Sequence, residues 1–149
     1  MKRMLRASIL FFVFLLSGCI GENYDFTPPS VSVSDTYGSR TLELEEANIN
    51  WNSDKTYTKE TEDIISLAKD QEPVYFEAGE QASILFDSQD FMVEDLSAYV
   101  WQDESETDLQ VKDREFSMPE EEGEYVMVVD LVSDSGTAQY VGNIVIFEE

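Results

Sequence analysis

The sequence contains no histidine and only one cysteine, Cys19. Imidazole and thiol groups supply most general bases, nucleophiles and soft-metal ligands in enzymes, so their scarcity excludes most hydrolytic sites. Zinc, copper and iron sites are not expected either. A carboxylate pair or a serine–lysine dyad is the catalytic alternative that stays open, but 32 acidic residues place carboxylates side by side by chance. We therefore expect no enzymatic activity.

Positive charge is also scarce, because nine Lys and Arg stand against 32 Asp and Glu, which gives a net charge of −23. Such a surface repels nucleic acids and anionic lipid headgroups, so neither is an expected partner. The simplest interpretation is that the acidic residues keep an exported protein soluble. Basic partners and cations stay open.

No apolar run reaches the roughly 20 residues that a membrane-spanning helix needs. The main run, Ile9–Leu16, follows a basic start that carries Lys2, Arg3 and Arg6 and no acid. A basic start before a short apolar run is the layout of a secretory signal peptide.

The run ends in Leu16, Ser17, Gly18 and Cys19. This order of aliphatic, small, small and cysteine matches the lipobox of bacterial lipoproteins at every position. The match implies cleavage after Gly18, a diacylglycerol thioether on Cys19, further fatty acyl such as palmitate, and an address on the extracytoplasmic face of the cell membrane. Two or three acyl chains anchor a protein stably where one does not. Removing residues 1–18 takes away three positive charges, so the net charge falls from −23 to −26.

The remaining chain divides into two parts. Residues 19–34 contain Pro28, Pro29 and many small polar residues with little hydrophobic periodicity, so we predict an acylated cysteine and a flexible tether. Residues 35–149 are then one domain, large enough for a single core. With Cys19 acylated no thiol is left for a disulfide, so the core alone must hold the fold.

Alternating apolar residues predict strands through most of this domain. One run extends from Leu42 to near Trp51, with a phase change at Glu45-Glu46 interpreted as a bulge. The segments 74–76 and 83–86 are interpreted as a pair of strands. The clearest hairpin joins Tyr125–Leu131 to Ala138–Ile146 across a turn at 133–136. One short helix is predicted over 61–69 with Thr61 as its cap. The pattern predicts an all-β, immunoglobulin-like sandwich of two sheets.

The segment Glu121-Glu-Gly123-Glu-Tyr125 has the acid-x-Gly-x-Tyr pattern of a tyrosine corner. Gly123 would supply a backbone conformation that other residues resist, and the Tyr125 hydroxyl would bond to the main chain nearby. A chance turn followed by an aromatic strand residue is the other interpretation.

Residues from about 40 to 147 resemble a family of small uncharacterised lipoproteins of Gram-positive bacilli. The resemblance rests on the following residues: Trp51, Pro73 to Gly79, Ile84, Phe86, Phe116, Pro119, Gly123, Tyr125, Gly136, Ala138 and Tyr140. Members often carry a cysteine pair around the equivalent of Trp51, which this chain lacks, so no redox or disulfide role is implied. The family has no assigned activity, so the resemblance implies only fold and address.

Two further groups are candidates for ligands. Oxygen ligands for calcium occur at Asp103, Glu104, Glu106 and Asp108, at 87–90, and at Asp130 with Asp134, although no EF-hand spacing is present. Solvated turns are the alternative.

Trp51, Tyr99 and Trp101 could form an aromatic platform for sugars, with Tyr99 and Trp101 on one strand face. A tryptophan within a sandwich strand is more often a core residue.

The sequence thus predicts a membrane-anchored, non-catalytic module that engages an unknown envelope or extracellular protein through an exposed sheet edge or loops. A calcium- or glycan-binding surface module is the alternative.

Overall fold

The computed structural model describes residues 27–149. The predicted signal peptide, the lipobox residues Leu16, Ser17 and Gly18, and Cys19 lie outside the described residues. Within residues 27–149, no helix is long and apolar enough to cross a membrane.

The described chain forms eleven strands and one short helix. Their bounds are β1 (Val31–Asp35), β2 (Thr41–Glu43), β3 (Glu45–Asn52), β4 (Thr56–Lys59), α2 (Ile64–Lys69), β5 (Val74–Glu77), β6 (Gln81–Phe86), β7 (Val93–Gln102), β8 (Ser105–Leu109), β9 (Glu115–Ser117), β10 (Gly123–Ser133) and β11 (Gly136–Phe147).

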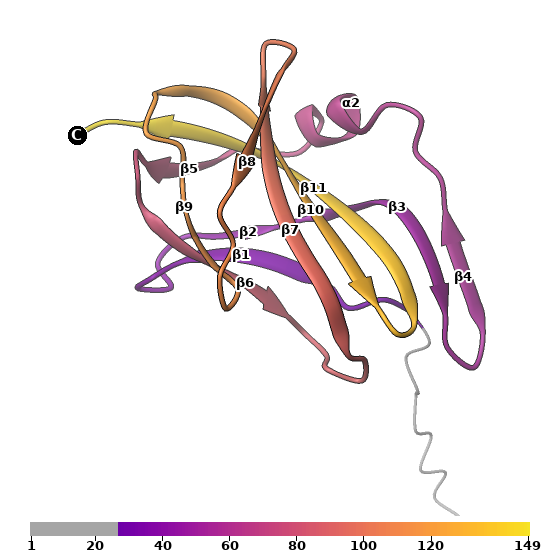
Figure 1. Ribbon diagram of the computed structural model, residues 1–149. Coiled ribbons are helices and arrows are strands. Elements are labelled where there is room, and N and C mark those ends of the chain that lie inside the picture. Colours follow the sequence, from indigo (N-terminus) through magenta and orange to yellow (C-terminus); the bar gives the residue numbers. More distant parts are fainter. Residues whose placement is uncertain (1–26) are drawn as a thin grey trace, which may run out of the picture.

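The strands form two sheets that pack face to face (Figure 1). One sheet has the order β2-β1-β6-β9, and the other has the order β4-β3-β11-β10-β7-β8, with β5 added beside β11. The predicted all-β sandwich of two sheets with one short helix is confirmed. The strand β11 has two partners along one side. Its first half pairs antiparallel with β3, and its last four residues pair parallel with β5.

Five of the last six strands have neighbours that also occur in an immunoglobulin sandwich. There, strands B and E are adjacent in one sheet, and C, F and G are adjacent in the other. Here β6 lies beside β9, and β7, β10 and β11 are adjacent in that order, in the same chain sequence. The strands β1 and β2 extend the smaller sheet beside β6, whereas β3, β4, β5 and β8 extend the larger one.

Alternation along the long β10–β11 hairpin supplies much of the core. Tyr125, Met127, Val129 and Leu131 lie on one face of β10, and they share the buried cluster between the sheets with Ala138, Tyr140, Ile144 and Ile146 of β11. Burying each such large side chain contributes about 1.5–3 kcal/mol. The opposite face of the hairpin is apolar as well, at Val126, Val128 and Val141, and α2 covers part of it through Ala68.

The tether boundary predicted at residue 34 is wrong. Residues 31–35 form β1, which lies between β2 and β6 in the four-stranded sheet, with Val31 and Val33 buried. The alternation Ser30-Val31-Ser32-Val33 is typical of a strand. The sequence near it gives no sign of a partner, because β6 begins 50 residues later at Gln81.

Two strand assignments also change. The run from Leu42 to Trp51 is two strands in different sheets, β2 and β3, and the irregular register lies opposite Ala138/Tyr140 rather than at Glu45-Glu46. The strands β5 and β6 exist but do not pair with each other, because β5 joins β11 and β6 joins β1 and β9.

The predicted helix forms as α2, but its cap is Asp63, whose carboxylate accepts the Ser66 N–H at 3.0 Å. The Thr61 hydroxyl instead donates to the main-chain oxygen of Ala47 at 2.7 Å.

The described chain begins at the end of the sandwich that holds the β3–β4, β6–β7 and β10–β11 turns, here called the near end (Figure 1). Ser30 and Asp87 are joined there by two hydrogen bonds. The β7–β8 turn, α2 and the C-terminus lie at the opposite end, here called the far end.

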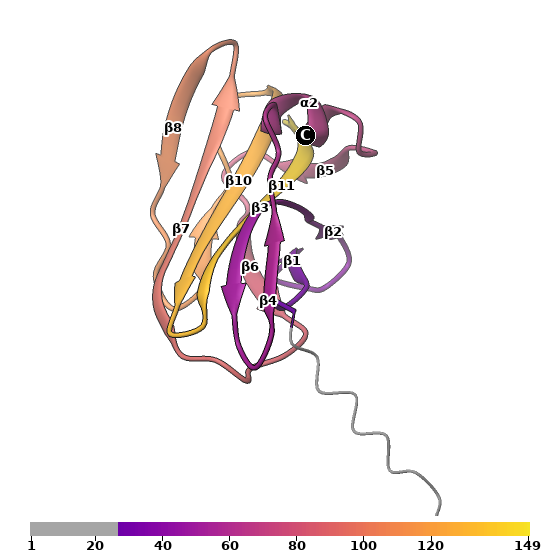
Figure 2. The same cartoon turned by 90° about the vertical axis from the view of Figure 1, so that its right-hand side faces the viewer.

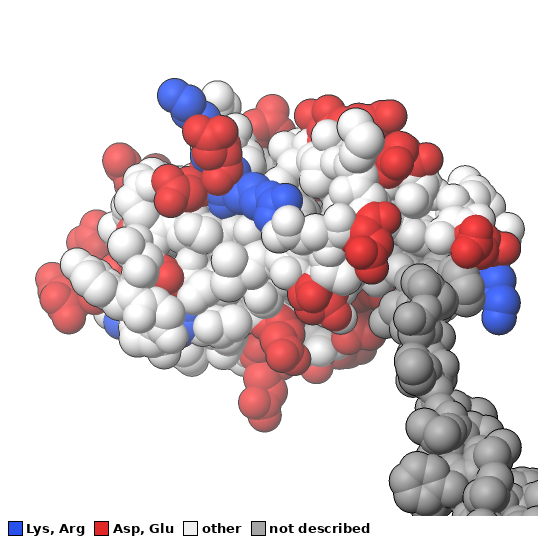
Figure 3. Space-filling model, turned by 90° about the horizontal axis from the view of Figure 1, so that it is seen from below, with Lys and Arg blue, Asp and Glu red and all other residues white. Residues whose placement is uncertain are grey.

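Acidic side chains are spread over the face seen from below rather than gathered in one place (Figure 3). Residues 27–149 contain 30 of the 32 acids and six of the nine basic residues, a net charge of −24.

Candidate functional site

A groove of about 700 Å³ lies at the far end, on the outer face of the larger sheet. The β7–β8 hairpin rises on one side of it, α2 lies on the other, and β10 begins between them (Figure 2). Its lining comprises Ile65, Lys69, Pro73, Tyr75, Trp101, Gln102, Asp103, Glu104, Glu124, Tyr125, Val126, Asn143 and Val145. We call it the far groove.

Strand register builds the floor of the far groove. Val126 of β10 is paired with Trp101 of β7 on one side and with Asn143 of β11 on the other. Two residues before Val126, Glu124 is paired with Val145 of β11, and Val145 is in turn paired with Tyr75 of β5. Paired residues project from the same face of a sheet, so these side chains share one surface.

The helix α2 forms a wall because its apolar side packs on the outer face of the sheet. Ala68 is fully buried against Val126, Val128 and Val141. The Asn143 side-chain amide donates to the main-chain oxygen of Gln71 at 3.1 Å and so holds the chain just beyond the helix. This packing leaves Lys69 exposed at the groove.

Two aromatic side chains stand on opposite sides of the groove. Trp101 packs partly buried beside Val126, and its indole N–H has no hydrogen-bond partner within residues 27–149. Tyr75, on β5, is 54% exposed. Because the indole N–H of Trp101 is buried, only the ring surface is open to a ligand in the groove.

The charge of the far groove is negative. Asp103 and Glu104 form the β7–β8 turn, and Glu124 lies near the start of β10; all three are exposed. Lys69 is the one basic residue in the lining. The groove therefore combines aromatic and apolar walls with three carboxylates.

The tyrosine-corner residues lie at the start of β10, where Tyr125 also lines the groove. The Tyr125 hydroxyl donates to the main-chain oxygen of Glu121 at 2.9 Å, which is the bond that the motif predicts. Gly123 has φ +147°, and a Cβ there would come within 2.3 Å of the Gln102 side chain. Burial, aided by the charge of Glu121, raises the pKa of Tyr125.

The four acids proposed for calcium are not brought together. Asp103 and Glu104 occupy the turn with positive φ, whereas Glu106 and Asp108 lie on β8 opposite Trp101 and Tyr99. Among residues 27–149, no group of three or more Asp, Glu, Cys or His side chains is arranged to hold a metal ion.

The other acids proposed as calcium ligands are spread over separate loops and strands. Asp87 accepts the Ser30 N–H at 2.7 Å, and Asp134 accepts the Met92 N–H at 2.8 Å. Asp130 is half-buried on β10, where burial raises its pKa. Burial of the neighbouring hydroxyl, with the charge of Asp130, raises the pKa of Tyr99 to about 12.

The predicted platform of three aromatic residues does not form. Trp51 is buried between the sheets, where its ring meets Phe91 edge-on at 5.4 Å between centroids. Tyr99 and Trp101 lie on the outer face of the larger sheet. The pairing of β3 with β11 is irregular, and this irregularity decides which residues of β3 face the core. A simple alternation of inward and outward residues along the sequence does not predict it.

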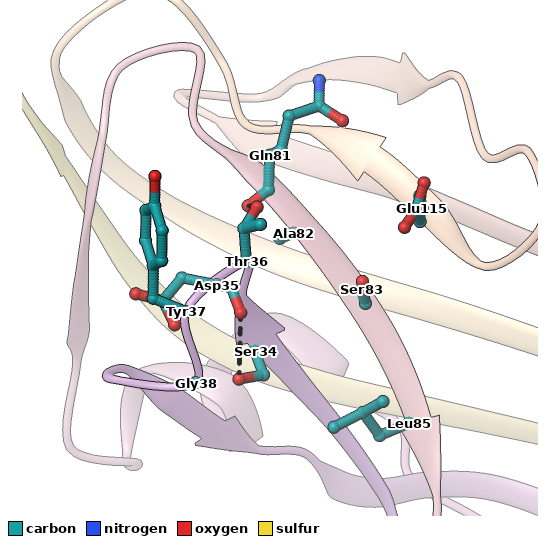
Figure 4. Close-up of a pocket in the computed structure, with 10 residues that line it drawn as sticks. All are labelled: Ser34, Asp35, Thr36, Tyr37, Gly38, Gln81, Ala82, Ser83, Leu85 and Glu115. Carbon is teal, nitrogen blue, oxygen red and sulfur yellow. Dashed lines mark hydrogen bonds between the residues drawn. The ribbon is translucent and has the colours of Figure 1, made fainter.

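A second hollow, of about 590 Å³, lies over the smaller sheet (Figure 4). Its buried carboxylate, Asp35, is already used within the β1–β2 turn: it accepts the Ser39 N–H at 2.7 Å, the Arg40 N–H at 3.2 Å, and a short bond from the Ser39 hydroxyl. The Ser39 hydroxyl, chiefly, lowers the pKa of Asp35. The rest of the lining mixes small side chains such as Ser34 and Ser83 with the larger Tyr37, Gln81, Leu85 and Glu115.

Sequence reasoning singled out Trp101, Asp103 and Glu104 but missed Tyr75 and Glu124. The alternation of Val74, Tyr75 and Phe76 indicates that Tyr75 points away from the core. Its place beside Val145 depends on the parallel pairing of β5 with β11, which has no local signal.

Comparison of the chain with protein-family models finds no match, and comparison with curated proteins finds none.

Proposed function

We propose that this protein is a lipoprotein anchored through Cys19 on the extracytoplasmic face of the cell membrane, where its immunoglobulin-like domain acts as a non-catalytic binding module for an envelope or extracellular protein. The observation that carries the binding role is the far groove. Its position, at the end of the sandwich opposite the start of the described chain, supports this role because a chain anchored before residue 27 would enter the domain at the end farthest from the groove.

The lipobox supports the anchor. The test is metabolic labelling of cells with an alkyne fatty acid, comparing the wild type with Cys19→Ala. Only the wild type is expected to carry label and to be cleaved, since the thiol is the acylated group. Equal label on the two proteins would end the lipoprotein proposal.

The groove can be tested separately in the same cells. A photo-crosslinking amino acid placed at Tyr75 is expected to capture a partner protein. The same amino acid at Tyr37 is the matched control, because Tyr37 is 91% exposed but lies beside the hollow over the smaller sheet. Identical products from the two positions, or none from Tyr75, would contradict a binding role for the groove.

The alternative, a glycan-binding module, has Trp101 and Tyr75 in its favour, since aromatic rings on both sides of a groove can also stack on sugars. Binding of an oligosaccharide that is lost in Tyr75→Ala would favour it.

A further inference from the structure

We propose that the far groove binds a basic peptide segment, with arginine side chains over the rings of Trp101 and Tyr75 and further basic side chains facing the groove carboxylates. This inference rests on the proposed binding function and names the chemistry of the partner.

Charge selects the class of ligand. The groove lining carries Asp103, Glu104 and Glu124 against the single basic residue Lys69, and the described chain has a net charge of −24 around it. A field of that sign draws in cationic segments and repels anionic polymers, so association with a basic partner is favoured over long distances.

The spacing of the carboxylates favours a peptide over a metal ion. Asp103 and Glu104 stand at the hairpin turn, and Glu124 lies on the neighbouring β10. They do not converge as a metal site requires, and residues 27–149 contain no such group. An extended peptide with several basic residues can place one positive charge near each of these separated carboxylates.

The aromatic walls favour a cation as well. A guanidinium that lies over an aromatic face is attracted by the ring, most strongly by tryptophan. Contacts of this kind occur within residues 27–149, where Arg114 lies over Phe86 at 4.6 Å and Arg40 over Phe147 at 5.4 Å. Trp101 and Tyr75 offer similar rings to a partner, and arginine fits them better than lysine because its charged group is planar.

The test uses the full chain in non-ionic detergent and the peptide acetyl-(Arg-Ala)4-amide as probe, with binding followed by tryptophan fluorescence. Trp51 is buried, so a change on binding reports Trp101. The groove variant carries Asp103→Asn, Glu104→Gln and Glu124→Gln. The matched control carries Glu60→Gln, Glu94→Gln and Asp95→Asn, which remove the same charge from exposed sites that do not line the groove.

We expect the groove variant to bind the arginine peptide about tenfold more weakly than the wild type, and the control to change by less than about twofold. Trp101→Phe is expected to abolish the fluorescence change. Circular dichroism melting checks that each variant is folded, and the exposed positions of the substitutions favour this.

Equal weakening in the groove variant and the control would overturn the proposal, because diffuse charge would then explain the binding. It would also fail if chitohexaose binds and the arginine peptide does not, or if neither binds. These outcomes differ from failure of the proposed function, which is shown by absence of lipid on Cys19 or of crosslinked protein at Tyr75.

Discussion

The Tyr140 hydroxyl donates a hydrogen bond of 2.7 Å to the main-chain oxygen of Pro29, 111 residues away in the sequence. Both residues are buried. The bond joins the chain just before β1 to the middle of β11, and thus links the two sheets at the point where the chain enters the fold. Burial also raises the pKa of Tyr140, so its hydroxyl stays protonated and able to donate.

Tyr140→Phe should therefore lower the free energy of unfolding by about 1–3 kcal/mol, because a buried main-chain acceptor loses its donor while ring packing is kept. Urea denaturation measures the loss. Tyr37→Phe is the control, since Tyr37 is 91% exposed and should not change the midpoint. Equal midpoints for Tyr140→Phe and the wild type would mean that water replaces the hydroxyl.

Tyr125→Phe should cost about 1 kcal/mol or slightly more, since one hydrogen bond to the Glu121 main chain is lost. The loss is smaller than for Tyr140 because Glu121 is exposed and water can partly satisfy its oxygen. The same urea titration checks it, with Tyr75→Phe as a matched strand tyrosine that is 54% exposed. An unchanged midpoint would mean that the tyrosine corner does not stabilise the fold.

Substitution of two glycines by alanine should distinguish the cost of backbone strain from the cost of a steric clash. Gly136 has φ +140°, and an added Cβ would lie 2.1 Å from the main-chain oxygen of Asn50 on β3. Gly38 has φ +68° with nothing within 4 Å of the added Cβ. Gly38→Ala should cost only about 1–2 kcal/mol of strain, whereas Gly136→Ala should cost several kcal/mol more because two strands must separate. Similar melting temperatures for the two variants would refute the close approach of β3 to β11.

Asp35 and Asp130 should respond to pH with opposite signs. Hydrogen bonding lowers the pKa of Asp35, so its carboxylate stabilises the fold above the unfolded pKa, and that stability is lost as pH falls through the lower folded pKa. Burial raises the pKa of Asp130, so its charge costs stability at neutral pH, and the cost disappears as pH falls through the raised folded pKa.

At pH 7 we therefore expect Asp35→Asn to destabilise the protein and Asp130→Asn to stabilise it. Both differences from the wild type should shrink as the pH falls, the Asp130 difference first because its pKa is raised and the Asp35 difference only in stronger acid because its pKa is lowered. Denaturation midpoints from pH 3 to 8 at constant ionic strength test this. The same sign for both variants at pH 7 would contradict the assignment.

The spread of acids makes a prediction about salts. Screening of repulsion within a domain of net charge −24 should let sodium chloride raise the melting temperature smoothly. Calcium at matched ionic strength should add nothing. A specific site would instead add about 2.7 kcal/mol at a hundredfold excess over its dissociation constant. Stabilisation by sub-millimolar calcium but not by magnesium would make the acids at 103–108 a ligand site after all.

Local patterns predicted what depends on neighbours in the sequence. The β10–β11 hairpin was readable because apolar residues recur at every second position on one face of each strand and a turn at 133–136 joins the strands. The contact of Tyr125 with Glu121 was readable because it spans four residues. The helix was readable from Ile64, Ile65 and Ala68, although its cap lies two residues later than predicted.

Features that depend on distant partners were not readable. Val31 and Val33 have the spacing of a strand, but two prolines precede them and β6 lies far along the chain. Leu42 and Trp51 sit in one alternating run and yet belong to different sheets. The far groove is assembled from four strands, one turn, one helix and the segment that follows the helix, so its residues carry no common motif.

The position of β1 has a mechanical consequence. If Cys19 is anchored and a partner holds the far end, any pull on the protein enters through the chain before β1. That strand has neighbours on both sides, β2 and β6, and Tyr140 holds Pro29 just ahead of it. Tension would thus be shared among β1, its neighbours β2 and β6 in one sheet, and β11 in the other, instead of peeling one edge strand away from the anchored end.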